Sequence, residues 1–396
     1  MSVTFAQGFA VAVGEAGIRD SGGPDLVLIA SHRPAAAAAT LTTNRVRAAP
    51  VLLVEAALRA SDGSARAVVV NAGCANAGTG SDGLADARAI VAATAAHLGC
   101  RVDEVLPAST GLIGSRLPVD AIVATIPALE LRRTPEAGTD AARAIMTTDT
   151  RPKERSVTAR LGDGREIRIG GMAKGAGMIH PQMATMLAFL TTDAPVPAAL
   201  LAALVRPAVE RTFNQVTVDG DTSTNDSVIV LANGAAGGAP IEGGADRDAF
   251  AAALETVCRE LAIAIAADGE GAQHLIEVRV DGAADDAAAR AVARTVASSS
   301  LVKTAVHGAD PNWGRIAAAA GRSGVAFDPD RLRICIGDVP VYDGAPLAFD
   351  EERATAALRD ATVLVALELG AGAGSGTAWG CDLSAEYVAI NSEYRT

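Results

Sequence analysis

The sequence predicts an α/β protein, in which the strands of β-sheets alternate with helices along the chain. Short, continuously apolar runs such as residues 26–29 and 67–70 alternate with long alanine-rich segments, as expected for strands that are covered on both faces. Apolar residues make up 49% of the chain but aromatic residues only 3%, so the core must consist mainly of Ala, Val, Leu and Ile. With 396 residues, the chain is too long for one ordinary core, and two lobes or two interleaved layers are expected.

The first third of the chain contains the clearest strand signals. The runs 26–29 and 67–70 predict buried strands, and the second is followed by a loop of small residues at 71–80 and a helix from about residue 83 to 98. Residues 105–114 predict a strand that runs into another small-residue loop. Loop 71–80 either lines a site or is a turn that leads into the helix, and the sequence leaves both readings open.

The middle and the end of the chain continue the same rhythm. Residues 141–146 predict a short helix, and residues 157–161 and 167–169 alternate around the turn 162–164, which predicts a hairpin. The remaining elements expected are helices at 197–211 and 250–267 and strands at 228–231 and 362–368. The apolar run 186–190 fits the start of a strand or of a helix, because periodicity does not separate these for a short run.

The segment after the hairpin is rich in glycine and predicts a loop built for a functional site. Gly170, Gly171, Gly175 and Gly177 surround a single lysine, Lys174, and glycines allow a backbone to approach another group closely. The segment does not fit a phosphate-binding loop of the Walker type, because a glycine and not Ser or Thr follows the lysine. A dinucleotide fingerprint also fails on spacing.

Residues 174–187 read Lys-Gly-Ala-Gly-Met-Ile-His-Pro-Gln-Met-Ala-Thr-Met-Leu and closely resemble the signature of the ornithine acetyltransferase, or ArgJ, family. The resemblance extends over essentially the whole chain. It implies a layered α-β-β-α structure with central mixed β-sheets, the ArgJ/DmpA-like fold. It also implies that the precursor cuts itself between Ala184 and Thr185, which divides the chain into an α chain, residues 1–184, and a β chain, residues 185–396.

The chemistry of a freed Thr185 is consistent with this resemblance. A threonine hydroxyl needs an adjacent base, and an N-terminal threonine carries one in its own α-amino group, with an ordinary pKa of about 7.7–8.0. Before cleavage that nitrogen is part of the amide, so cutting the chain creates the base. The small side chain of Ala184 leaves the Ala184 carbonyl open to attack by the hydroxyl of Thr185.

The resemblance also implies roles for residues outside the signature. Thr110 and Gly111 resemble an oxyanion hole, because a hydroxyl beside an unshielded glycine amide offers two hydrogen-bond donors. Glu270 lies between two glycines at the predicted end of a helix, where the helix dipole disfavours a carboxylate, and it is a candidate for binding a cationic amine. The substrate-binding residues implied are Thr147 or Thr148, Lys174, Thr185, Glu270, Asn391 and Thr396.

Two further segments match the family. Residues 219–226 are acidic but lack the spacing of an EF-hand calcium loop, and they either buttress the site or form a solvated turn. Residues 301–315 contain His307 and Asp310, which invite a triad hypothesis, yet a threonine that uses its own amine has no need of one. We interpret residues 301–315 as support for the site and as an interface.

Composition excludes several classes of protein. The net charge of −12 argues against a nucleic-acid or anionic-membrane surface. The N-terminus has no signal-peptide pattern and no run is long enough to span a membrane, so a cytoplasmic location is expected. Five scattered cysteines form no metal-binding pair, so neither a metal nor another cofactor is expected, with acetyl-CoA open as a second acetyl donor.

The leading hypothesis is an acetyltransferase of the cyclic arginine pathway that moves acetyl from N2-acetyl-L-ornithine to L-glutamate through an acetyl-Thr185 intermediate. The α and β chains would stay together and assemble as α2β2 or larger. The alternative is a self-processed N-terminal-threonine aminopeptidase or amidohydrolase that uses water. A non-catalytic metabolite-binding protein of the same fold is a third hypothesis.

Overall fold

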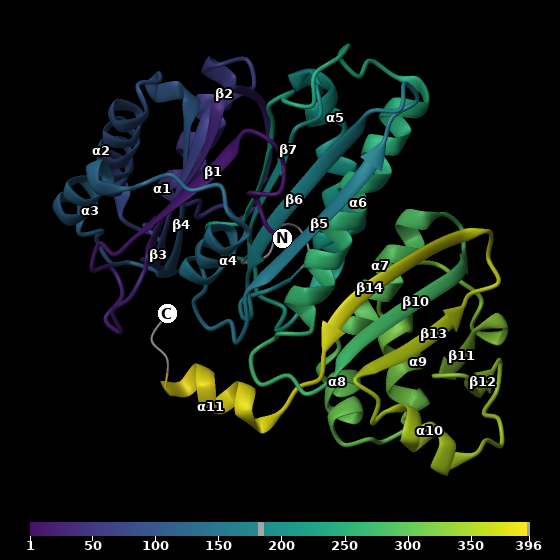
Figure 1. Ribbon diagram of the computed structural model, residues 1–396. Coiled ribbons are helices and arrows are strands. Elements are labelled where there is room, and N and C mark those ends of the chain that lie inside the picture. Colours follow the sequence, from purple (N-terminus) through teal and green to yellow (C-terminus); the bar gives the residue numbers. More distant parts are fainter. Residues whose placement is uncertain (181–185, 394–396) are drawn as a thin grey trace.

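The computed structural model describes residues 1–180 and 186–393, which form two mixed β-sheets flanked by helices (Figure 1). The first sheet has eight strands in the described residues, with the order β4-β3-β2-β9-β7-β6-β5 and β1 paired to β2. Its strands are β1 (Phe9–Gly14), β2 (Leu26–Leu41), β3 (Ser64–Cys74), β4 (Val105–Leu112), β5 (Lys153–Arg160), β6 (Glu166–Lys174), β7 (Leu187–Thr192) and β9 (Ser227–Ala232).

Helices cover the first sheet in layers. Helices α2 (Gly80–Leu98) and α3 (Val119–Thr125) lie beyond the β1–β4 half, and α6 (Gly244–Ala266) lies beyond β5 and β6 (Figure 1). Helix α5 (Ala198–Arg211) packs beside α6 and against β2 and β9. The inner faces of both halves share one apolar cluster with α1 (Ala49–Ala60) and α4 (Pro135–Ala144). The predicted α-β-β-α layering with mixed sheets is therefore confirmed.

The predicted hairpin is present as β5 and β6, with Lys153 opposite Ala173 and Arg160 opposite Glu166. One part of the sequence interpretation is wrong here: Gly170 and Gly171 do not begin a loop but lie within β6. Their lack of a side chain serves packing, because a Cβ on Gly170 would lie 2.1 Å from the carbonyl oxygen of Ser2. The run after residue 186, left open by periodicity, is the fully buried strand β7.

The second sheet has six strands in the described residues and its own apolar core, to which the helices that cover it contribute. Its strands are β8 (Val216–Thr217), β10 (Leu275–Ala283), β11 (Arg333–Ile336), β12 (Val339–Asp343), β13 (Thr362–Glu368) and β14 (Gly374–Cys381). Its helices are α7 (Asp286–Ala297), α8 (Ser300–His307), α9 (Trp313–Gly321) and α10 (Glu351–Ala357). The strand predicted at 362–368 is β13 with the same bounds.

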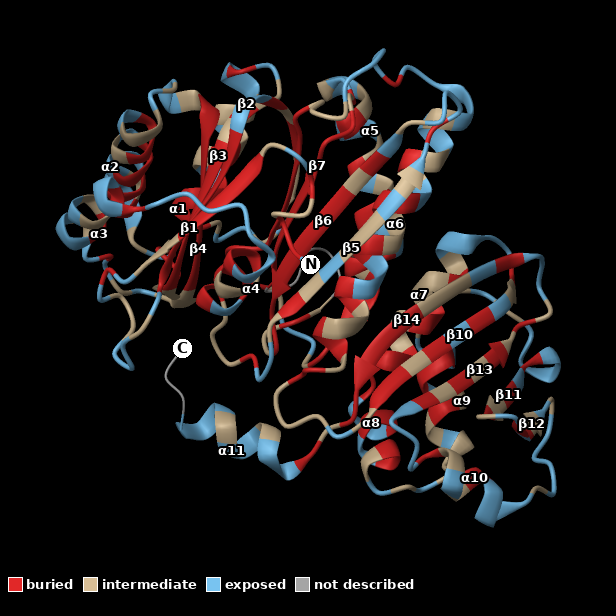
Figure 2. Cartoon of the chain, viewed as in Figure 1, coloured by how far each residue is buried: buried red, intermediate tan, exposed pale blue. Residues whose placement is uncertain are grey.

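The last helix, α11 (Ala385–Glu393), leaves the second sheet and reaches back toward the first (Figure 1). Both sheets are largely buried, whereas α11 has no buried residue among those described and lies at the surface (Figure 2). The helix is therefore placed by a few specific contacts and not by burial of an apolar face.

Candidate active site

A cavity of about 240 Å³ lies where the ends of β4 and β6 meet the turn after α6 and helix α11. It is lined by Ala75, Thr110, Gly111, Ile113, Thr147, Thr148, Lys174, Gly177, Met178, Asp219, Asp221, Ser223, Thr224, Asn225, Glu270, Tyr387 and Asn391. The structure thus gathers every predicted site residue that lies within its described residues, from segments far apart in the sequence. Thr147 and Thr148 both line the cavity.

Thr110 and Gly111 lie at the end of β4, where this strand runs parallel to the end of β3. Gly111 has a φ of +125°, and a Cβ there would lie 2.3 Å from the carbonyl carbon of Gly73. Only glycine fits such a close approach. The tight pairing of β3 and β4 places Thr110 and the backbone of Gly111 at the cavity wall.

Lys174 ends β6, and its buried ammonium donates a hydrogen bond to Thr110 Oγ1 at 3.2 Å. Burial lowers the pKa of Lys174, and the nearby carboxylate of Asp149 opposes this effect. An ammonium group is only a donor, so Thr110 Oγ1 accepts this bond and its own hydrogen remains available for another acceptor.

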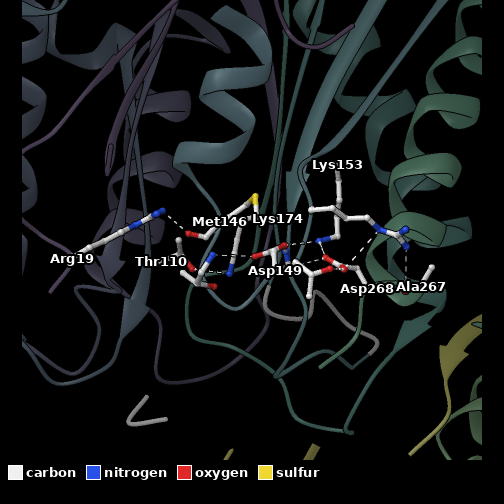
Figure 3. Close-up of polar contacts among 12 residues, drawn as sticks. Arg19, Thr110, Met146, Asp149, Lys153, Lys174, Ala267 and Asp268 are labelled. Carbon is white, nitrogen blue, oxygen red and sulfur yellow. Dashed lines mark hydrogen bonds and ion pairs between the residues drawn. The ribbon is translucent and has the colours of Figure 1, made fainter. Parts of the chain in front are cut away.

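Sequence reasoning missed a buried ionic cluster beside the cavity (Figure 3). Lys153 donates to Asp149 Oδ1 at 2.6 Å and to Asp268 Oδ2 at 2.5 Å, and all three side chains are buried. Burial alone would raise the pKa of Asp149, but Lys174 and Lys153 more than offset it and lower that pKa. The charges are visible in the sequence, but no local signal shows that these are the buried ones.

Glu270 follows α6 and lines the cavity together with Thr110 of β4. Its amide donates to Ala176 O at 2.9 Å, and its Oε2 accepts a hydrogen bond from Asn391 Nδ2 of α11 at 2.7 Å. Tyr387 of α11 also lines the cavity, and sequence reasoning missed it as well. Burial, together with Asp219, raises the pKa of Tyr387.

The acidic segment 219–226 buttresses the site, and the alternative of a solvated turn is wrong for residues 223–226, which are buried, whereas Gly220 and Asp221 are exposed. Asp219 accepts from Ile179 N at 2.9 Å and from Met178 N, and Asp226 accepts from Met186 N at 3.0 Å. Asn225 Nδ2 donates to Ala75 O and Ser109 O at 2.6 and 2.8 Å. The bond to Ala75 joins the segment to loop 71–80, and Ala75 itself lines the cavity.

Residues 301–315 do not line the cavity, and the pair His307/Asp310 does not form a triad. His307 Nδ1 lies 2.8 Å from Asp382 Oδ2 instead. The other oxygen of Asp382 accepts from Gln273 N and His274 N, each at 2.8 Å. The segment therefore supports the chain just after Glu270 and does not take part in the cavity.

Three predicted residues, Ala184, Thr185 and Thr396, lie outside the described residues. Their described neighbours are His180, Met186 and Glu393.

Within residues 1–180 and 186–393, no helix has the length and apolar character needed to cross a membrane. The same residues contain no group of His, Cys, Asp and Glu side chains that could hold a metal ion.

Named relatives match this chain over its whole length. A family model described as the ArgJ family matches residues 10–396. A protein of Synechocystis sp. named arginine biosynthesis bifunctional protein ArgJ is 51% identical over 100% of this chain and 98% of its own. A Thermus thermophilus protein of the same name is 51% identical and is covered to 100% in both directions.

A solved structure of Bacillus halodurans, also named arginine biosynthesis bifunctional protein argJ, is 45% identical with a TM-score of 0.50. The alignment covers 52% of this chain and 97% of that chain. The solved chain is therefore only about half as long as this one.

Proposed function

This chain belongs to the ArgJ family, and from that premise we propose that it is an acetyltransferase of arginine biosynthesis. It transfers the acetyl group of N2-acetyl-L-ornithine to L-glutamate through an acetyl ester on Thr185. The observation that carries this proposal is the cavity, in which Thr110, Lys174, Glu270 and Asn391 meet. The likeness to proteins named bifunctional ArgJ, at about half of all positions over the full chain, agrees with it.

The nucleophile that we propose is the hydroxyl of Thr185, freed by cleavage after Ala184 into chains 1–184 and 185–396. Its α-amino group takes the hydroxyl proton as the oxygen attacks the acetyl carbonyl. Two observations support the division. Asp226 accepts a hydrogen bond at 3.0 Å from the amide of Met186, the second residue of the proposed β chain, and the solved Bacillus halodurans chain has about half the length of this one.

The negative charge that develops on the acetyl oxygen needs hydrogen-bond donors. We assign this role to the Thr110 hydroxyl and the Gly111 amide. Because Lys174 occupies an acceptor position of Thr110 Oγ1 at 3.2 Å, the hydroxyl hydrogen is free to point at the substrate. The positive charge of a protonated Lys174 would strengthen that donor.

The acetyl transfer takes place in two half-reactions at one site. In the first, the ester to Thr185 forms, the amide bond of acetylornithine breaks, and the departing α-nitrogen of ornithine takes up the proton held by the α-amino group. In the second, the neutral amine of glutamate attacks the ester, and its proton passes through the α-amino group of Thr185 to the threonine oxygen as the ester bond breaks. N-acetylglutamate leaves and the hydroxyl of Thr185 is regenerated. Glu270, held by Asn391 at 2.7 Å, would bind the substrate ammonium group, with Thr147 or Thr148 and Thr396 as further contacts.

Substrate scope and assembly extend the proposal. No cofactor is needed for this chemistry, and acetyl-CoA would be a second acetyl donor, in keeping with the word bifunctional in the names of the relatives. The α and β chains would remain associated, as α2β2 or larger, in the cytoplasm. A panel assay with acetylornithine or acetyl-CoA as donor tests the scope, and light scattering tests the assembly.

Initial-rate kinetics test the central claim. A shared acetyl-enzyme predicts parallel double-reciprocal lines for acetylornithine and glutamate, and a convergent pattern would contradict it. The alternative, an N-terminal-threonine aminopeptidase or amidohydrolase, is not favoured by the full-length ArgJ match; it predicts free acetate, where transfer predicts N-acetylglutamate. An uncleaved yet fully active chain by intact mass spectrometry would remove Thr185 as the N-terminal base.

A further inference from the structure

Lys153 is a buried lysine that the proposed reaction does not use. It begins β5, and its ammonium lies between two buried carboxylates, at 2.6 Å from Asp149 Oδ1 and 2.5 Å from Asp268 Oδ2 (Figure 3). Burying three charged groups costs desolvation energy that a surface ion pair avoids. A buried cluster of three charges is therefore weak evidence for stabilisation. The contacts of its two carboxylates indicate a positioning role instead.

Asp149 holds two walls of the cavity at once. Its Oδ1 accepts from the amide of Gly175 at 2.7 Å, directly after Lys174, and its Oδ2 accepts from the amide of Thr147 at 3.0 Å. Lys174, Thr147 and Thr148 line the cavity, whereas Asp149 does not. A movement of this carboxylate would therefore displace both cavity segments together.

Asp268 belongs to the turn that carries Glu270, the third segment of the cavity lining that the cluster contacts. It accepts from Thr150 N at 3.1 Å and from the Thr150 hydroxyl, and it lies two residues before Glu270 in the turn after α6. Arg151 also approaches it, with Nε 3.7 Å from Oδ1. Through Lys153, the turn that carries Glu270 is thus connected to the segments that carry Lys174 and Thr147.

We propose that Lys153, Asp149 and Asp268 form a buried brace of positioning residues that holds Lys174 and Glu270 in place across the cavity and balances the charge around Lys174. The proposal rests on the proposed function only in what the positioned residues do. None of the three lines the cavity, so each acts through another residue.

The brace also affects the proton affinity of Lys174. Burial lowers the pKa of Lys174; among its neighbours, Asp149, Asp226 and Glu270 raise that pKa and Lys153 lowers it. Removing the charge of Lys153 should therefore raise the pKa of Lys174, and removing the charge of Asp149 should lower it. A purely structural role would not move the pKa in opposite directions.

The direct test is the reaction of Lys174 with cyanate at a series of pH values, followed by peptide mass spectrometry of the full chain. Only the neutral amine reacts, and cyanate is small enough for the cavity that Lys174 lines. The pH midpoint should move up in Lys153→Met and down in Asp149→Asn. The matched control is Arg160→Met on the same strand, whose exposed pair with Glu166 is remote from the cavity; its midpoint should equal that of the wild type.

Acetyl-transfer kinetics on the same proteins test positioning. In Lys153→Met, kcat/KM should fall about 10- to 100-fold, as for displacements of about 1 Å, and Arg160→Met should match the wild type. Midpoints that stay fixed, or that move in the same direction in both variants, overturn the brace, and so does an unchanged kcat/KM in Lys153→Met.

Two further outcomes are also decisive. If the wild type transfers no acetyl group, the proposed function fails, while the cyanate midpoints still decide whether the brace controls Lys174. If Lys153→Met does not fold, the direction of the Asp149→Asn midpoint decides alone, and a midpoint that is unmoved or moves upward overturns the proposal.

Discussion

Gly177→Ala tests whether Glu270 binds substrate, because it should displace that carboxylate without unfolding the protein. A Cβ at residue 177 would lie 2.4 Å from Glu270 Oε2, 2.5 Å from Oε1 and 2.5 Å from Cδ. The backbone of Gly177 lies outside the left-handed region, so alanine adds no strain there. Ordinary contact begins near 3.4 Å, so the carboxylate must retreat by about 1 Å. The end of a long, flexible side chain can make this movement at little cost in stability.

The displaced carboxylate would lose its bond to Asn391 and its place at the cavity. We expect KM for acetylornithine to rise about 10- to 100-fold, measured by steady-state kinetics, with the melting temperature within a few degrees of the wild type by calorimetry. Gly321→Ala is the matched control, since a Cβ there meets no atom within 4 Å. An unchanged KM in Gly177→Ala would refute the assignment of Glu270 as a substrate-binding residue.

Thr110→Val removes a hydroxyl with little change in volume, so kcat should fall by about 10²–10³ if that donor serves the oxyanion; steady-state kinetics with an unchanged kcat would argue against it. Thr185→Ala should leave an intact, inactive chain and Thr185→Ser should still be cleaved, as intact mass would show; cleavage of the alanine variant would exclude this hydroxyl as the attacking group. Burial raises the pKa of Asp226 well above its usual range, so its stabilising contribution is present at low pH and is lost as the pH rises through the raised pKa. Asp226→Asn should therefore lose less unfolding free energy than the wild type as the pH rises from about 4, the ordinary pKa of an aspartate, toward neutral pH in urea titrations; an equal loss would indicate a charged native carboxylate.

Local patterns in the sequence were sufficient for much of the fold. Alternation with a glycine turn predicts the β5–β6 hairpin, and continuous apolar runs predict β2 and β3, because these signals depend on neighbouring residues alone. Gly170 shows where such reasoning fails. A glycine is required at residue 170 because a Cβ there would lie 2.1 Å from the carbonyl oxygen of Ser2. Ser2 is far from Gly170 in the sequence, so no local pattern reveals this contact.

The site was less accessible to local reasoning. The resemblance to a family, and not periodicity, pointed to Thr110, Glu270 and Asn391, which come from different segments of the fold. Neither local pattern nor spacing singles out Lys153 and Asp268, which are 115 residues apart and meet only in the folded protein. Buried and solvated charges look alike in a sequence, so a cluster of this kind is found only from coordinates.

The strand order of the first sheet has a consequence for how the two proposed chains could be made. Strands β9 and β7, from residues 185–396, stand in the middle of the sheet, with β2 on one side and β6 on the other. An α chain produced alone would lack the two central strands, so that β2 and β6 would each have an unpaired edge. Unpaired strand edges promote aggregation. Separate expression of the halves should give insoluble material, whereas under the proposed cleavage a single precursor would build the sheet first and be cut afterwards. In the proposed arrangement the uncut polypeptide would serve as its own assembly template.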